Sequence, residues 1–334
     1  MDDRENLIAA LDGRVARRAD RRAFFTAAFG AAAVGAALVG SGPALAQATP
    51  TPSPSPTPTA TPVTDFDVLN FALNLEYLEA NFYSFAVNGT AIPAASTTGT
   101  IGTAGAATGG RAVTFTDPVV AAFAREIAAD ELAHVNYLRT TIGSTAVVQP
   151  AINLGTGASD PFSTAARAAG IITAATDTFD PYLNDINFLL GAFIFEDVGV
   201  TAYKGASVLI TSAAYRDAAA GILAVEAYHA ATIRGALYAK GLDTPTARTY
   251  ADRISDARDL LDGSGADFDQ PISPVTVQGD LASNIMPLDG TGIAFGRTTL
   301  EVLNIAYLTR ASVTKGGFFP NGVNGVINAS SAAA

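Results

Sequence analysis

The sequence has 334 residues, a length that allows one large domain or two domains of ordinary size. It contains no cysteine, which excludes disulfides, thiolate catalysis and metal sites with cysteine ligands. The formal net charge of −11 disfavours binding to nucleic acid and to anionic membranes but favours attraction of cations. Hydrophobic residues make up 49% of the chain, which is enough for a substantial core.

Residues 1–46 are predicted to be a targeting segment. Five arginines between residues 14 and 22 precede an uncharged run, which ends in the small-x-small pattern Ala44-Leu45-Ala46. The block Asp20-Arg21-Arg22-Ala23-Phe24-Phe25 resembles a twin-arginine export signal. We expect cleavage and export to the periplasm or the cell exterior, which leaves no membrane contact. An uncleaved anchor is the alternative, because the run of 24 residues over 23–46 could span a bilayer.

Residues 47–64 are predicted to be a linker. Within them, residues 47–62 alternate proline with threonine, serine and alanine. This pattern has no apolar face to bury, and it favours the extended polyproline II conformation. We interpret the linker as a spacer that carries no chemistry.

Four long helices are predicted in residues 65–241. Apolar residues recur at helical spacing in the first, and Asp-Pro pairs at Asp117 and Asp180 give the expected starts of the second and third. Gly241 is expected to end the fourth. The predicted ranges are 66–87, 118–141, 181–210 and 213–240. The connection between the second and third helices, residues 144–179, is long enough to cross the length of a bundle.

Both histidines of the chain lie in Glu-x-x-His motifs. Glu131 precedes His134 in the second helix, and Glu226 precedes His229 in the fourth. Residues three apart share a helix face, so each motif directs a carboxylate and an imidazole at one point. Helical bundles use this motif to hold half of a two-metal site.

The first and third helices supply matching carboxylates. Tyr83 follows Glu76 by seven residues and Tyr203 follows Glu196 by seven residues, which is two helical turns. Glu196 also follows eight uncharged residues, 188–195, where a carboxylate without a partner would be unstable. The chain therefore predicts two copies of one helix pair, with four carboxylates and two imidazoles in a shared core. Tyr83 and Tyr203 are expected either to donate hydrogen bonds to these carboxylates or to fill the core.

Other charged residues lie near the motifs. We expect the acidic ones to face solvent or to pair with the two arginines that follow the histidines by five residues. Glu79 is the first substitute ligand if Glu76 points elsewhere. The set is Glu79, Glu126, Asp130, Asp197, Arg139 and Arg234.

The pattern resembles the ferritin-like superfamily of two-metal proteins, and within it the bacterial desiccation-related group. The resemblance covers about residues 65–241 and includes the tail motifs Phe295-Gly296-Arg297-Thr298 and Gly317-Phe318-Phe319-Pro320-Asn321-Gly322. It implies an all-α fold: a four-helix bundle with a long crossover between helices two and three. It also implies roles for six residues. The terminal ligands would be Glu76 and Glu196, the bridging ligands Glu131 and Glu226, and the histidine ligands His134 and His229.

Residues 242–334 are predicted to be a C-terminal extension. A fifth helix over 245–261 and a sixth over 298–309 flank a loop rich in Gly, Pro and Asp. Two short helices cannot form a core alone, so we expect them to pack on the bundle. The loops are much longer than those of cage-forming ferritins. A cage is therefore not expected, and a homo-oligomer stays open.

The predicted cofactor is a pair of divalent metal ions, iron or manganese, whose charge the four glutamates would offset. With dioxygen or hydrogen peroxide as partner, such a pair implies ferroxidase-like or peroxide-removing chemistry in stress protection. The alternative is a non-catalytic protein of the cell envelope that protects against drying, with a structural metal site or a lost one. The sequence supports the site better than it supports turnover.

Overall fold

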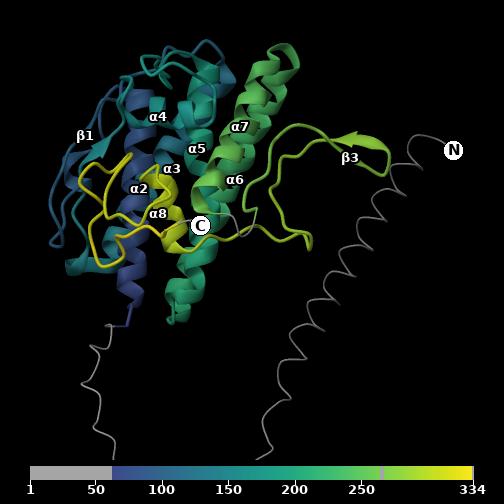
Figure 1. Cartoon of the computed structure of the whole chain (residues 1–334). Helices are drawn as coiled ribbons and strands as arrows, with labels where there is room; N and C mark the ends of the chain where they lie inside the picture. Colours follow the sequence, from purple (N-terminus) through teal and green to yellow (C-terminus); the bar gives the residue numbers. More distant parts are fainter. Residues whose placement is uncertain (1–61, 264–266, 333–334) are drawn as a thin grey trace, which may run out of the picture. The chain divides into compact units, whose positions relative to one another are not determined.

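The computed structural model describes residues 62–263 and 267–332. The predictions for the targeting segment and for most of the linker fall outside these residues. In the part that is described, long helices dominate and the strands are two or three residues long. The expectation of an all-α fold is therefore confirmed (Figure 1).

Four long helices form the bundle. α2 packs against α3 and α5 packs against α6, and the two pairs meet through contacts of α2 with α5 and of α3 with α6. Figure 1 shows these helices side by side. Their bounds are Asp65–Asn88 for α2, Pro118–Ile142 for α3, Asp185–Ala206 for α5 and Ala213–Asp243 for α6.

Side-chain caps fix where α2 and α3 begin. Thr64 forms a capping box with Asp67 at the start of α2. Asp117 accepts hydrogen bonds from the backbone N–H groups of Val119 and Val120, and Pro118 needs no donor there. The two helices begin within one residue of the predicted starts at 66 and 118.

The predicted start of the third helix was wrong. The Asp180 side chain accepts from the backbone N–H of Tyr182 and pairs with Arg111, so it closes a turn. Asn184 caps α5 instead, because its side chain accepts from the backbone N–H of Asn187. The predicted end of the fourth helix was also early. α6 runs through Gly241 and ends only where Thr244 and Pro245 begin α7.

The two long connections meet beside the bundle. β1, Ala107–Thr108, pairs in parallel with β2, Ile152–Asn153. The second connection also holds α4, Pro161–Ala168, which the sequence analysis missed. Its start repeats the Asp-Pro pair, at Asp160 and Pro161, so a signal was present.

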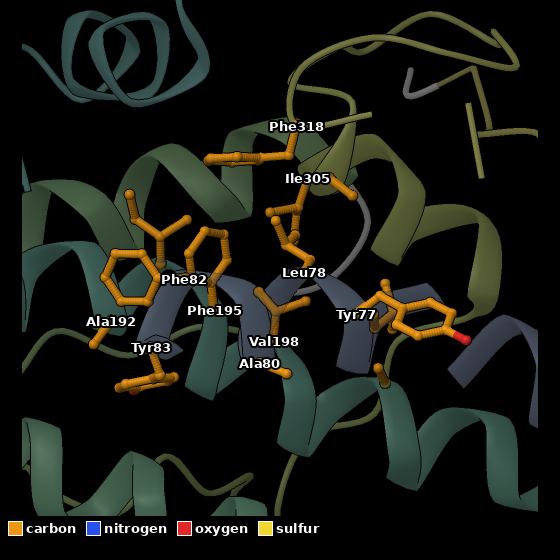
Figure 2. Close-up of a cluster of buried hydrophobic side chains, with 14 of the residues drawn as sticks. Tyr77, Leu78, Ala80, Phe82, Tyr83, Ala192, Phe195, Val198, Ile305 and Phe318 are labelled. Carbon is orange, nitrogen blue, oxygen red and sulfur yellow. The ribbon is translucent and has the colours of Figure 1, made fainter. Parts of the chain in front are cut away.

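The C-terminal region packs on the bundle. α7, Pro245–Asp262, contacts α6 and α5, whereas α8, Thr299–Ala306, contacts α5 and α7. Between them, β3, Val275–Val277, and β4, Asp280–Ala282, form an antiparallel hairpin. Figure 2 shows Ile305 and Phe318 beside Leu78 and Phe195. The Phe318 and Phe195 ring centroids are 4.9 Å apart, so the tail extends the bundle core.

α5 is buried along most of its length. Together with the turn that follows it, Asp185–Leu209, it is the one helix of the described residues that is long and apolar enough to cross a membrane. In its most apolar stretch 89% is buried inside the protein. Packing in the core therefore explains the apolar run that the sequence analysis noted before Glu196.

Candidate metal centre

All six predicted ligands point into one buried centre. They come from the four bundle helices, and each is at most 8% exposed. They form two overlapping groups in which one ligand atom from each residue lies within 4.8 Å of the others. Glu131 and Glu226 belong to both groups. The arrangement could therefore hold two cations that share these two carboxylates. The groups are Glu76, Glu131, His134 and Glu226, and Glu131, Glu196, Glu226 and His229.

Both imidazoles present Nδ1 to the centre. His229 Nδ1 lies 2.9 Å from Glu131 Oε1 and 3.5 Å from Glu196 Oε2. His134 Nδ1 lies 3.3 Å from Glu76 Oε2 and 3.7 Å from oxygens of Glu131 and Glu226. Glu131 is the carboxylate that approaches both rings.

The donor atoms fit a metal ion. Nine buried side-chain nitrogen and oxygen atoms in the described residues have no hydrogen-bond partner, and all but Asp197 Oδ1 belong to the six predicted ligands. A buried polar atom without a partner costs about 1–3 kcal/mol. A cluster of such atoms would be expensive unless something satisfies it. Carboxylate oxygen and imidazole nitrogen are suitable ligands for iron and manganese.

Burial and mutual repulsion shape the charges of the carboxyl groups. Burial, helped by the negative charge of Glu131, raises the pKa of Glu76 to about 7. Burial also raises the pKa values of Glu196 and Glu226. Burial alone would raise the pKa of Glu131 as well, but the imidazoles of His134 and His229 lower it to about 2.

The pKa values of both histidines are raised. Burial alone would lower the pKa of His134, but Glu131 and Glu76 raise it to about 11. The pKa of His229 is raised above its usual range by Glu131 and Glu196. Before a metal ion binds, the centre therefore retains protons that a divalent cation would displace.

The two tyrosines make crossed hydrogen bonds. The Tyr83 hydroxyl on α2 donates to Glu196 Oε1 on α5, and the Tyr203 hydroxyl on α5 donates to Glu76 Oε1 on α2. In both glutamates, Oε2 has no hydrogen-bond partner. Each tyrosine thus orients the glutamate of the opposite helix and leaves its second oxygen free for the centre. Of the two roles left open by the sequence, both tyrosines act as hydrogen-bond donors.

Asp130 contacts His229 rather than an arginine. Its Oδ2 lies 3.2 Å from His229 Nε2, although the Asp130 side chain is 43% exposed. If Nε2 donates this hydrogen bond, the lone pair of Nδ1 faces the centre. His134 has no carboxylate at this distance from its Nε2 among residues 62–263 and 267–332. On α6 the position before Glu226 is Val225.

Glu79 is buried, so the expectation that it faces solvent or pairs with an arginine was wrong. It is 5% exposed. Burial, with the negative charges of Glu131, Glu76 and Glu196, raises its pKa well above the usual range. The equivalent position on α5 is Gly199, where an added Cβ would overlap Glu226 Oε2 and lie 3.4 Å from Glu79 Oε1. The glycine makes room for both carboxylates. The contrast between Glu79 and Gly199 at equivalent positions of the repeat was the sequence signal for this arrangement.

The other charged residues behave as expected in part. Glu126 is exposed. Asp197 pairs with Arg234, with 2.8 Å between Oδ2 and Nη1, which confirms the predicted ion pair. Asp197 also pairs with Arg258 from α7, which the sequence could not indicate. Arg139 makes no carboxylate contact in the described part of the chain and instead donates to the carbonyls of Ala95 and Thr98.

Comparisons with known proteins agree with this geometry. The family model described as ferritin-like domain matches residues 64–239. Desiccation-related protein PCC13-62 from Craterostigma plantagineum is 29% identical over 271 residues, which cover 79% of this chain and 84% of the relative. Ferritin-like catalase Nec2 from Nesocodon mauritianus is 28% identical over 275 residues, also 79% of this chain and 84% of the relative. No solved structure matches the chain significantly.

The family match covers more than half of the chain, and its limits coincide with the four-helix bundle that carries the buried carboxylates and imidazoles. The chain therefore belongs to the ferritin-like family.

Proposed function

We propose that the chain binds two divalent metal ions, iron or manganese, and removes hydrogen peroxide. The observation that carries the proposal is the set of buried ligand atoms without hydrogen-bond partners, which converge from four helices. Glu76 and His134 would hold one ion, Glu196 and His229 the other, and Glu131 and Glu226 would bridge them. When bound, the pair of metal ions supplies the electrons exchanged with peroxide.

The protein's own residues would fix and isolate this pair. The tyrosine hydroxyl groups hold Glu76 and Glu196 in place, and Asp130 holds His229. All six ligand residues are buried, which limits access of bulk water. Glu79 is a further buried carboxyl group beside the centre, with a raised pKa, and could hold or release a proton.

Peroxide removal is favoured over ferroxidase activity by one comparison. A relative with 28% identity is named a ferritin-like catalase. In a catalase reaction one peroxide is reduced to water while another is oxidised to dioxygen, so no additional reductant is required. A ferroxidase would instead consume dioxygen while it oxidises ferrous iron.

The test is metal analysis followed by an oxygen-electrode assay. The full chain, reconstituted separately with manganese and with iron, should hold about two ions per chain and release dioxygen from hydrogen peroxide. Glu226→Gln should lose this activity, whereas Glu126→Gln, an exposed control on α3, should retain it. Uptake of dioxygen with ferrous iron, without peroxide breakdown, would replace the proposal with ferroxidase activity.

A non-catalytic role is the second candidate, because the other relative is named a desiccation-related protein. In that case the metal would act as a structural staple. Metal removal would then lower the melting temperature of the protein while the loaded protein showed no reaction with peroxide or dioxygen.

We also propose that the protein is exported and acts in stress protection outside the cytoplasm. The support is the arginine-rich start, the uncharged run and the Ala44-Leu45-Ala46 pattern. N-terminal analysis of the protein from its native compartment should find a chain that begins near Gln47. Replacement of Arg21 and Arg22 by lysine should retain the precursor in the cytoplasm, and an unchanged distribution would refute the twin-arginine route.

A further inference from the structure

A cavity lies outside the metal centre, between α5, α6 and the segment 268–295. Its volume is about 210 Å³. Each helix contributes the residues one, four and five positions after its ligand glutamate, Glu196 or Glu226. These residues lie on the helix face next to the one that carries the ligands. These are Asp197, Val200 and Thr201 on α5, and Ala227, Ala230 and Ala231 on α6. The segment lines the other side mainly with hydrophobic residues, among them Phe268, Met286, Leu288 and Phe295.

We propose that this cavity binds a small neutral molecule that combines an apolar, ring-sized body with one hydrogen-bond donor. Nothing in the proposed metal chemistry requires such a site. The proposal rests on the shape of the cavity, on an unsatisfied acceptor in its wall and on the charges around it.

In the other half of the bundle, larger side chains stand at the positions equivalent to the cavity wall. One and five positions after Glu76 are Tyr77 and Asn81, both fully buried. The Tyr77 hydroxyl donates to the Val147 carbonyl, and Asn81 donates to Gln149 Oε1. Figure 2 shows the Tyr77 hydroxyl pointing away from the apolar cluster. Large side chains and a loop thus occupy this region. On α3, the positions that correspond to the three alanines of α6 are the larger Leu132, Val135 and Asn136.

The unsatisfied acceptor is Asp197. Its Oδ2 accepts from both Arg234 and Arg258, at 2.8 and 2.7 Å. Its Oδ1 is buried and has no hydrogen-bond partner, and Asp197 is 3% exposed in the cavity wall. A buried acceptor of this kind is costly. Oδ1 is itself closed to solvent, so a ligand reaches it only with a small movement of the wall, and a donor that does so would gain a strong hydrogen bond.

The surrounding charges favour a neutral donor. Three buried arginines and three buried aspartates form one connected set of ion pairs. Their formal charges balance, so an added ammonium group would lose its hydration without a free counter-charge. A hydroxyl or neutral N–H donor satisfies Oδ1 without this cost. The six residues are Arg234, Arg258, Arg297, Asp197, Asp262 and Asp269.

The outer wall is held in place and still leaves an entrance. Arg234 donates to the carbonyls of Gln270, Pro271, Asn284 and Ile285, which fixes two separate parts of the wall segment to α6. Met286 in the same wall is 66% exposed, so the cavity opens to solvent beside it. An apolar cavity of roughly 150 Å³ can already bind benzene, so a substituted single ring fits the available space.

The test uses phenol as the probe, because it is neutral at neutral pH and joins one ring to one donor. Met286 is one of two methionines in the sequence, and the other is Met1. In the full chain labelled with ¹³C at the methionine methyl groups, phenol should shift the Met286 signal saturably and leave the Met1 signal unchanged. Toluene, which lacks the donor, should bind about tenfold more weakly or worse.

Two substitutions are designed to fill the cavity. A third substitution, at an exposed position, serves as the control. Ala230→Leu and Ala231→Leu should weaken phenol binding by about tenfold or more by occupying its space. Ala224→Leu lies on an exposed position of the same helix and should leave binding unchanged. The proposal is overturned if phenol produces no saturable Met286 shift or if toluene binds equally well. It is also overturned if both filled variants bind phenol like the unsubstituted chain.

Discussion

The α2–α3 half and the α5–α6 half of the bundle contribute equivalent ligands in different surroundings. Each half supplies one lone glutamate, one Glu-x-x-His motif and one tyrosine that reaches the other half. Beside these positions the halves diverge. Glu79 corresponds to Gly199, and Asp130 corresponds to Val225. The comparison shows that the two halves are symmetric in the predicted ligands, whereas neighbouring positions distinguish the two ligand groups.

The two arginines that follow the histidines extend the comparison. Arg139 donates to carbonyls of Ala95 and Thr98 in the loop after α2. Arg234 is fully buried and donates to four carbonyls of the C-terminal segment as well as to Asp197. Both residues fasten a connection to the bundle, but Arg234 does so inside the core. The C-terminal segment is therefore part of the α5–α6 half.

The largest expected effect comes from Glu131, because this carboxylate approaches both imidazoles whereas Glu226 approaches only His134. Glu131→Gln should reduce the metal content from about two ions per chain to less than about one. Glu226→Gln should retain more metal than Glu131→Gln. Elemental analysis of the purified chains measures both, with Glu126→Gln as the exposed control. Equal metal content in all three variants would refute the assignment of the centre.

The second-largest expected effect is on the free energy of unfolding, and it distinguishes Arg234 from Arg139. Arg234→Met breaks a buried ion pair and leaves buried carbonyls without a donor, so it should lower the free energy of unfolding by about 3–5 kcal/mol. Arg139→Met removes hydrogen bonds at the surface and should lower it by about 1 kcal/mol. Urea unfolding followed by circular dichroism, on preparations with equal metal content, measures the difference. A similar loss in both variants would contradict the distinction between a buried and a surface anchor.

A smaller effect should separate the two metal positions. Asp130→Asn weakens the partner of His229 Nε2 and should lower the affinity for one ion by about 10–100-fold. Val225→Asp places a carboxylate at the equivalent position beside His134 and should leave the His229 side unchanged. Competition with a chelator, followed as two release steps, would resolve the ions. If Asp130→Asn weakened both steps equally, the two positions would not be distinguished by this contact.

The smallest expected effect is the change in metal affinity with each pH unit. The pKa of His134 is raised to about 11 and that of Glu76 to about 7, so both groups hold protons in slightly acid solution. A divalent ion must displace these protons, and its affinity should therefore rise with pH. The rise is about tenfold per pH unit for each proton displaced. Metal titrations at about pH 6 and pH 8, with a pH indicator, would measure it, and an affinity that fell with pH would refute the sign.

The sequence alone determined the long helices and the residues that meet in the centre. Helical periodicity is local, so Glu131 and His134 share a face whatever lies opposite them. The Asp117 cap is also local, and it gave the start of α3. The predicted start of α5 was wrong because Asp180 pairs with the distant Arg111. No pattern in the sequence reveals that contact.

Only the tertiary structure decided what surrounds the centre. The seven-residue spacing placed Tyr83 beside Glu76, but the hydrogen bond goes to Glu196 on another helix. The cavity beside Asp197 likewise depends on Arg258 and on a segment more than 70 residues away in the chain. Spacing along one helix fixes which face a side chain occupies. Its partner, in contrast, depends on how helices and loops distant in sequence pack against that face.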